Sequence, residues 1–295
     1  MRCEAGVTTT FPMRGDAALV LEGGGMRAQY ASGAMDFFLK EGLRFPYVIG
    51  VSAGISNAAS YVSGQFERNR RIYTTFAGDP RYFSWRNWLR QGNPFGMDFI
   101  YRELPKYLPF DFAAFEASPT RFRIGATDCE TGRAIFFDKA DAPLTEALLA
   151  SSSLPMVGRM ARVNGKLYLD GGISDPIPFR QAGADGFPRR VVVLTRNRGF
   201  RKPKPRAAHR AAIRWKYRHF PPLAEAVVRQ AETYNREMDE LEAEEAAGQV
   251  LVIRPSQPLA VGRYSQDREE LERLYQNGWA DAEAGAPQLH DFLSP

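Results

Sequence analysis

The sequence is poor in cysteine and histidine and has no long apolar run. Its two cysteines, Cys3 and Cys129, lie far apart, so nothing indicates a disulfide framework or a thiolate metal site. Residues 1–16 lack the apolar stretch of a secretory signal, and no segment approaches the roughly 20 apolar residues that span a bilayer. We therefore expect a cytoplasmic protein that is folded in a reducing compartment, with peripheral membrane contact left open.

The composition is otherwise that of a globular protein. The 295 residues are 44% apolar and 25% charged, which argues against disordered and fibrous classes. Single cores stop growing at roughly 250–300 residues, so this length allows one large α/β domain or a domain with a smaller partner.

Short apolar runs alternate with amphipathic segments along the first two thirds of the chain. The predicted elements are strand 17–21, helix 29–40, strand 46–50, helix 55–62, hairpin 121–126 with 134–137, helix 144–150, strand 166–169 and strand 191–195. This alternation predicts a three-layer α/β fold with a mainly parallel central sheet. An aromatic-rich segment over 79–115 is less regular. It is expected to pack over the sheet, to form the wall of an acyl-chain pocket, or to do both.

The composition changes near residue 200. The predicted elements of the last third are helix 223–247, strand 250–253 and helix 267–284. We therefore expect a main domain over 16–200 and a smaller helical or α+β extension over 201–295.

A basic segment joins these two parts. Twelve lysines or arginines and no acid lie between Arg189 and Arg218. The segment is either a solvated face or a patch attracted to anionic lipid head groups. In the second case, four aromatic residues would lie at the interface: Phe200, Trp215, Tyr217 and Phe220. No nucleic-acid-binding motif accompanies the charge, so no nucleic acid is expected as a partner.

A possible nucleophile lies between a predicted strand and a predicted helix. Gly50-Val51-Ser52-Ala53-Gly54 fits the nucleophile elbow, in which a tight turn exposes a serine. Gly50 and Gly54 are small because neighbouring backbone passes close to the turn. Ser52 would then lie at a helix N-terminus, where N–H groups favour developing negative charge.

A glycine-rich loop follows the first predicted strand. The backbone N–H groups of Gly23, Gly24 and Gly25 can point together as an oxyanion hole, and Arg27 can hold the loop or attract a phosphate. Gly23-x-Gly25-x-x-Ala28 also satisfies the dinucleotide-binding fingerprint, so a nicotinamide or flavin enzyme is an alternative. The next strand ends in Ser52 and not in an acid that would bind a ribose.

Ser52 needs a base, and Asp170 is the candidate. Asp170 follows a strand and precedes Gly171 and Gly172, at the sheet edge where α/β active sites collect. Within hydrogen-bond reach of Ser52 it would accept the proton, as the second member of a dyad. A Ser-His-Asp enzyme is the alternative, because His209 and His219 follow in the chain.

These three motifs, in this order, resemble those of the patatin-like phospholipases. Ala150-Ser151-Ser152-Ser153-Leu154-Pro155 and Ser174-Asp175-Pro176-Ile177-Pro178 also resemble the segments that flank the family's aspartate. The resemblance covers roughly residues 16–200, and the last third is similar to the extension of a bacterial branch. The family usually has glycine where this chain has Ala28.

The resemblance implies a patatin-like fold and hydrolysis of a lipid or phospholipid ester without metal or cofactor. It implies Ser52 as nucleophile, Asp170 as base and the backbone of Gly23, Gly24 and Gly25 as oxyanion hole, with Arg27 in the same motif. A catalytically silent lipid-binding protein remains the alternative from another class.

Overall fold

An eight-stranded sheet forms the centre of the molecule. A computed structural model describes residues 15–294, and Cys3 lies outside the described residues. The strand order is β5-β6-β3-β2-β1-β7-β8, and β4 pairs with β3. The strands are β1 (Ala17–Leu21), β2 (Tyr47–Val51), β3 (Arg121–Asp128), β4 (Ala134–Phe137), β5 (Ala161–Val163), β6 (Lys166–Asp170), β7 (Arg189–Val193) and β8 (Val250–Ile253).

The middle of this sheet is parallel. Strand β1 pairs in parallel with β2 and β7, and β2–β3 and β7–β8 are also parallel. The pairs β3–β4, β3–β6 and β5–β6 are antiparallel. Parallel strands place their carboxyl ends at one edge of a sheet, which is where the glycine loop and the serine turn of this chain lie.

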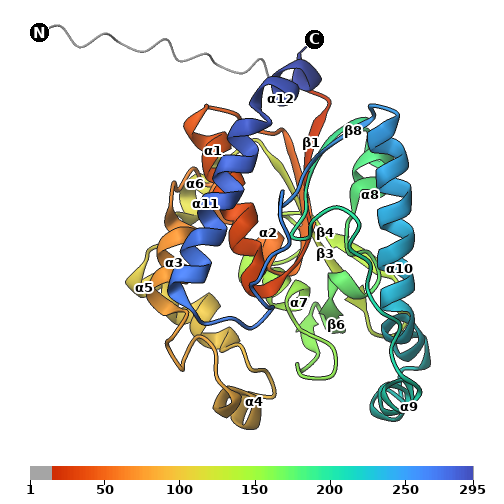
Figure 1. Ribbon diagram of the computed structural model, residues 1–295. Coiled ribbons are helices and arrows are strands. Elements are labelled where there is room, and N and C mark those ends of the chain that lie inside the picture. Colours follow the sequence, from red (N-terminus) through yellow and green to blue (C-terminus); the bar gives the residue numbers. More distant parts are fainter. Residues whose placement is uncertain (1–14, 295) are drawn as a thin grey trace, which may run out of the picture.

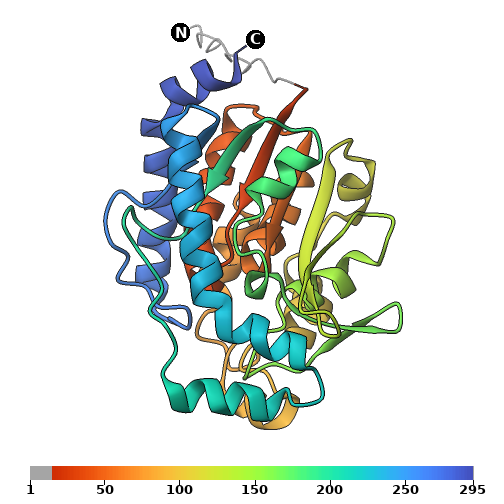
Figure 2. The ribbon, with the colours of Figure 1, turned by 90° about the vertical axis from the view of Figure 1, so that its right-hand side faces the viewer.

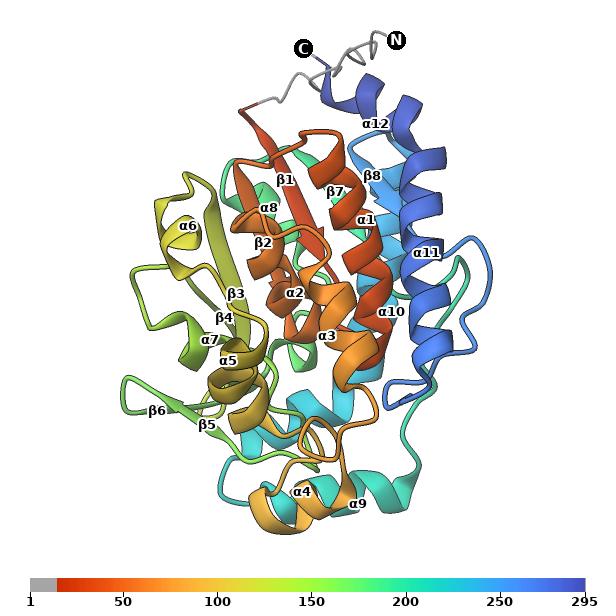
Figure 3. The ribbon, with the colours of Figure 1, turned by 90° about the vertical axis from the view of Figure 1, so that its left-hand side faces the viewer.

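Helices cover both faces of the sheet (Figure 1). One face carries α1 (Gln29–Lys40), α2 (Ser52–Val62), α3 (Arg68–Phe76) and α11 (Arg268–Ala284), which lie in front in Figure 3. The other face carries α8 (Phe179–Ala184) and the long α10 (Pro221–Ala246), which lie in front in Figure 2. The expected three-layer α/β fold is confirmed.

The sequence of β1 shows why the sheet is buried on both faces. Ala17, Leu19 and Leu21 pack into the core under α1 and α2, whereas Ala18 and Val20 pack into the core under α8 and α10. All five are fully buried. Because side chains alternate between the faces of a strand, a strand covered on both sides must be apolar throughout.

The aromatic segment forms short helices and turns near the end of the sheet where the serine lies. These are α4 (Trp85–Gln91), a π-helical turn (Phe99–Glu103), α5 (Leu104–Tyr107) and α6 (Phe112–Ala117). The expected lack of long elements here is confirmed. Several elements elsewhere escaped prediction, namely β5, α3, α8, α9 (Ala207–Lys216) and α12 (Ala286–Leu293).

The last third packs onto the central sheet. Strand β8 extends the sheet beside β7, and α11 packs along α1. The contact between these helices is close, since a Cβ added to Gly278 would lie 1.9 Å from the carbonyl oxygen of Tyr30. The division of the chain at residue 200 stays a prediction. Within residues 15–294, no helix has both the length and the apolar character needed to cross a bilayer.

Candidate functional site

Ser52 lies in the turn between β2 and α2 and has an unusual backbone. Its φ is +55°, in the left-handed region that residues with a side chain rarely adopt. Helix α2 begins at Ser52 itself, three residues before the predicted start. The side chain is only 7% exposed. Such strain persists only where the surrounding structure enforces it, and it is concentrated at functional sites.

The glycines around the serine permit β2 and α2 to approach the end of β1 closely. A Cβ on Gly54 would lie 2.3 Å from the carbonyl oxygen of Glu22, at the end of β1. No side chain fits there, which explains the second glycine of the predicted elbow. Gly50 lies in β2 and pairs with Leu21 of β1. The glycine loop after β1 is therefore held directly beside Ser52.

Asp170 is hydrogen-bonded to the serine. The Oγ of Ser52 donates to Asp170 Oδ2 at 2.7 Å, and the N–H of Gly172 donates to Asp170 Oδ1 at 2.8 Å. Asp170 ends β6, and Gly171 and Gly172 begin the 3-10 turn that follows. Burial raises the pKa of Asp170, while the hydrogen bonds from Ser52 and Gly172 oppose that rise. The structure thus brings together two residues that lie 118 positions apart.

Ser151 supports the turn in a way the sequence did not reveal. The N–H of Ser52 donates to Ser151 Oγ at 2.8 Å, and this hydroxyl donates to the carbonyl of Gly125 at 2.6 Å. Ser151 is fully buried at the end of α7 (Leu144–Ser151). It therefore links the serine turn to β3. The run Ser151-Ser152-Ser153 was visible in the sequence, but its spacing did not indicate which hydroxyl reaches Ser52.

The glycine loop leaves its backbone donors free. The N–H groups of Gly23, Gly24 and Gly25 make no hydrogen bond to any residue within 15–294. A hydrogen bond fixes the start of the loop, because the carbonyl of Gly23 accepts from Thr195 Oγ1 at 3.0 Å. The Glu22 carboxylate accepts from the N–H of the same threonine at 2.6 Å.

Arg27 is buried and follows the glycine loop in the sequence. It is 5% exposed, and its Nε has no hydrogen-bond partner among the described residues. Burial lowers the pKa of Arg27 to about 10, and the positive charge of Arg196 lowers it further, whereas Glu22 opposes the change. This side chain adds positive charge to the site from inside the protein.

Ser52 lines two cavities of different character. The larger one is mainly apolar, and the smaller one is polar and contains the glycine loop and Asp170. Residues from the aromatic segment and from α3 and α7 line the apolar cavity, including Ile72, Phe95, Met97, Ile100, Leu104 and Leu148. The aromatic segment therefore packs over the sheet and also forms a wall of this cavity. Its role as the wall of an acyl-chain pocket stays a prediction. The residues Gly25, Ser52 and Leu154 line both cavities.

The polar groups that line the apolar cavity form hydrogen bonds with one another. The Tyr101 hydroxyl lies 2.8 Å from Ser56 Oγ and 2.9 Å from Ser152 Oγ. This group of hydroxyls lies next to the serine turn, and its mutual hydrogen bonds reduce the cost of a dry environment.

No histidine reaches the serine. His209, His219 and His290 are all exposed, and none lines either cavity. Among residues 15–294, no group of three or more His, Cys, Asp or Glu side chains is arranged to hold a metal ion.

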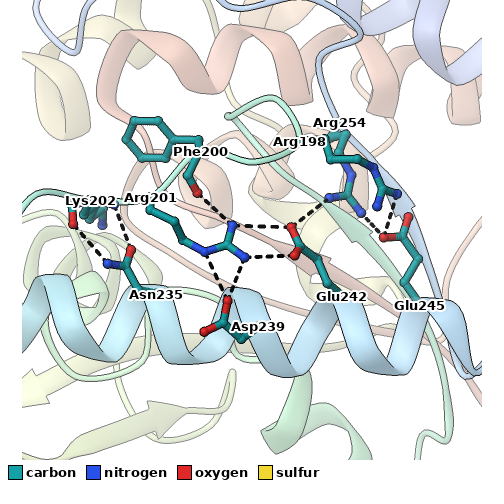
Figure 4. A network of polar contacts seen from close by, with 9 residues as sticks. All are labelled: Arg198, Phe200, Arg201, Lys202, Asn235, Asp239, Glu242, Glu245 and Arg254. Atoms are coloured by element: carbon teal, nitrogen blue, oxygen red, sulfur yellow. Dashed lines mark hydrogen bonds and ion pairs between the residues drawn. The ribbon is translucent and has the colours of Figure 1, made fainter.

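Much of the basic segment faces the acidic helix α10 (Figure 4). Arg201 pairs with Asp239 at 2.7 Å and with Glu242 at 2.8 Å, and Arg198 pairs with Glu245 at 3.0 Å. Of the four aromatics expected at an interface, Trp215 is 72% exposed, Tyr217 is buried, and Phe200 and Phe220 are half-buried.

Two family models match this chain. The model described as Patatin-like phospholipase matches residues 19–182, and one described as a domain of unknown function (DUF6363) matches residues 220–294. The first match contains the glycine loop, Ser52 and Asp170. The second covers α10, β8, α11 and α12.

Individual proteins are also similar to this chain. The Escherichia coli protein YjjU is 28% identical over 186 residues, which are 61% of this chain and 52% of that protein. NTE family proteins of Mycobacterium bovis and Mycobacterium tuberculosis are 38% identical over 66 residues, or 22% of this chain and 18% of theirs. VipD from Legionella pneumophila aligns with a TM-score of 0.46 and 14% identity over 95% of this chain and 67% of its own. The match thus spans about half the length of the E. coli relative.

Proposed function

The chain belongs to the patatin-like phospholipase family, and on that premise we propose that it hydrolyses lipid carboxylic esters with Ser52 and Asp170 as a catalytic dyad. The observation that carries the proposal is the 2.7 Å hydrogen bond from Ser52 Oγ to Asp170 Oδ2 at a strained turn. A serine becomes a nucleophile only when a base accepts its proton, and Asp170 is the base in contact with it.

In the proposed first half-reaction, Ser52 Oγ attacks the ester carbonyl while its proton moves to Asp170 Oδ2. The tetrahedral intermediate then collapses, the ester bond breaks, and the leaving alcohol takes that proton. In the second half-reaction a water molecule gives a proton to Asp170 and attacks the acyl group on Ser52. The fatty acid leaves as Ser52 Oγ recovers the proton. The burial that raises the pKa of Asp170 makes it a better proton acceptor than an exposed aspartate.

The free N–H groups of Gly23, Gly24 and Gly25 are the proposed oxyanion hole. They belong to the loop that packs against Ser52, since a Cβ on Gly23 would lie 2.9 Å from the Cβ of Ser52. Fixed donors of this kind stabilise the negative charge that develops on the carbonyl oxygen, and they do so without reorganising during the reaction. Arg27 lines the polar cavity with this loop and adds positive charge.

The apolar cavity is the proposed site of the acyl chain. It opens beside Ser52 and is lined by aliphatic and aromatic side chains, which bind a hydrocarbon chain by removing apolar surface from water. A catalytically silent lipid-binding protein could have the same cavity. It would have no reason to keep Ser52 strained and hydrogen-bonded to a buried carboxylate.

Labelling with a fluorescent alkyl fluorophosphonate tests the proposal. We expect wild-type protein to be labelled, and Ser52→Ala and Asp170→Asn to lose labelling and ester hydrolysis by about a thousandfold or more. His209→Gln/His219→Gln is the matched control and should retain both, because neither histidine lines the site. Normal labelling of Asp170→Asn would overturn the dyad, and loss of labelling in the histidine variant would favour the triad.

A further inference from the structure

The polar cavity holds more positive charge than the proposed ester chemistry uses. Arg27, Lys202 and Arg263 line it, together with the acids Glu22 and Asp170. Both acids already accept hydrogen bonds, Glu22 from Thr195 and Asp170 from Ser52 and Gly172. Two of the three cations, Lys202 and Arg263, come from the part of the chain beyond residue 200.

Lys202 is fixed at its backbone and lacks an acidic partner. Its N–H donates to Asn235 Oδ1 at 2.7 Å, and its carbonyl accepts from Asn235 Nδ2 at 3.0 Å (Figure 4). The ammonium lies 3.9 Å from the centre of the Tyr234 ring. No residue within 15–294 forms a hydrogen bond or ion pair with Lys202 Nζ, and burial lowers the pKa of Lys202 to about 8.

Neighbouring cations of the same segment have acidic partners, so the absence of an ion pair is particular to Lys202. Arg201 and Lys204 both pair with acids of α10, Arg201 with Asp239 and Glu242, and Lys204 with Glu232 at 3.3 Å. Lys202 lies between them, yet its side chain lines the cavity. The charges of Glu22 and Asp170 partly compensate Lys202, but neither carboxylate forms an ion pair with it. A half-buried cation without an ion pair is costly, and a bound anion would offset that cost.

Arg263 is held against the glycine loop by its own backbone. Its carbonyl oxygen accepts from the N–H of Met26 at 3.1 Å, so the segment between β8 and α11 closes over the loop. No described residue pairs with its guanidinium group. The Arg263 charge is therefore available to a ligand beside Ser52.

We propose that Lys202 and Arg263 form a subsite for a phosphate group on the alcohol side of the ester. This inference rests on the proposed function, because it takes Ser52 as the position of the carbonyl. An acyl chain in the apolar cavity directs the alcohol toward the polar cavity, where these two cations meet the phosphate of a phospholipid head group. The C-terminal part of the chain thereby selects phosphate-bearing esters over neutral ones.

Matched substrates test the subsite. The measurement is the ratio of kcat/KM for a lysophospholipid to kcat/KM for a monoacylglycerol with the same short acyl chain, below the aggregation limit of both. We expect Lys202→Met and Arg263→Met each to lower this ratio about ten- to a hundredfold, as loss of a charge-assisted hydrogen bond does. Lys202→Arg should retain most of the preference. Lys204→Met is the matched control, because Lys204 lies outside both cavities, and should keep the wild-type ratio.

A binding measurement separates this inference from the proposed chemistry. Calorimetry with the Ser52→Ala protein should show tighter binding of the lysophospholipid than of the monoacylglycerol, and Lys202→Met in that background should remove the difference. This result would support the subsite even if wild-type protein hydrolysed neither ester. Equal binding of the two lipids would overturn it. Lys202-dependent binding of inorganic phosphate without any preference between the lipids would assign the cations to free phosphate and overturn the head-group assignment.

Discussion

Ser52 and Asp170, which share a hydrogen bond, each have one feature that is unfavourable for stability. Ser52 has a left-handed backbone, which costs about 1–3 kcal/mol, and Asp170 is a carboxylate only 5% exposed. A protein gains no stability from either feature, so both are best explained by the chemistry they permit. The turn is enforced by Gly54, which lets β1 and α2 meet, and by Ser151, which binds the N–H of Ser52.

The raised pKa of Asp170 predicts the acid side of the pH profile. Asp170 acts as a base only when ionised, and its pKa lies above the ordinary value of 3.8 because of burial. As the pH falls through that raised pKa, the carboxylate gains a proton and kcat/KM should fall tenfold per pH unit. The measurement is kcat/KM for a soluble ester between pH 4 and 9. A rate that stays constant down to pH 4 would contradict the role of Asp170 as base.

Ser151 gives a prediction on stability and reactivity together. Ser151→Ala leaves the N–H of Ser52 and the carbonyl of Gly125 buried without their partner, and should lower the free energy of unfolding by about 1–3 kcal/mol. The loosened turn should also slow fluorophosphonate labelling about ten- to a hundredfold. Urea unfolding and labelling rates measure the two effects.

Ser153→Ala is the control for this prediction. Ser153 is also buried, but its hydroxyl bonds only to the carbonyl of Leu149, one turn earlier in α7. Its loss should change stability less than the loss of Ser151 and leave labelling fast. Equal effects of the two substitutions would show that Ser151 has no special part in positioning Ser52.

At the scale of elements, the aromatic segment joins the apolar cavity to the surface. Phe95, Met97 and Ile100 line the cavity, while Trp85 and Leu89 on α4 are 61% and 77% exposed. We propose that α4 contacts a lipid surface, because its exposed side chains belong to the segment that walls the acyl site. Tryptophan is well suited to such an interface, since one part of the ring system is apolar and the N–H remains solvated.

Vesicle binding tests the contact. Trp85→Ser/Trp88→Ser should weaken binding to phospholipid vesicles about tenfold or more, because the variant buries less apolar surface in the lipid. Hydrolysis of a monomeric short-chain ester should change less than vesicle binding. Phe66→Ser is the control, because Phe66 is 44% exposed beyond the end of α2 opposite Ser52. If Phe66→Ser impaired binding as strongly, the contact would not be specific to α4.

Element predictions succeeded where the residues make one structure clearly better than others. Strand β1 was located to the residue because five apolar residues stop at Glu22 and the glycines. Helix α2 was predicted too late because Ala53-Gly54 gives little helical signal after Ser52. Its start depends instead on the packing of β1 and the bond from Ser151. Helix α8 escaped because six residues carry too little periodicity.

The candidate site was predictable only as far as its motifs extend. The sequence indicated Ser52, Asp170 and the glycine loop, and the structure brings all three together. Lys202 was one of twelve cations in a basic segment, and nothing local distinguished it from Arg201. The distinction arises because α10 supplies acids to Arg201 but not to Lys202. Arg263 lies in a loop whose position depends on the packing of β8 and α11.

At the scale of the whole molecule, the last third is integrated with the first two. Strand β8 continues the sheet beside β7, and α11 lies along α1 in the same helical layer (Figure 3). Arg263 lies in the connection between β8 and α11, so the same packing that completes the sheet also positions a proposed substrate contact. We therefore expect the last third and the site to unfold in one transition.

The close contact of α1 and α11 makes this prediction measurable with one substitution. A Cβ on Gly278 would lie 1.9 Å from the Tyr30 carbonyl, so Gly278→Ala must push the helices apart and should cost about 1–3 kcal/mol of unfolding free energy. Alanine is intrinsically favoured over glycine in a helix by about 1 kcal/mol, so a gain in stability is expected if the contact is loose. Urea unfolding measures the change, and a gain in stability would contradict the close contact of the two helices.

Gly262→Ala is the control for the helix contact, because a Cβ there has no neighbour within 4 Å. It should leave stability nearly unchanged. If the last third is integrated with the sheet, the protein should unfold in one cooperative transition, and Gly278→Ala should shift that transition. Fluorophosphonate labelling and the helical circular dichroism signal should then be lost over the same urea range. A separate early transition, with labelling intact after it, would mean that residues 19–182 form the site alone. The integration of the last third with the site would then be contradicted.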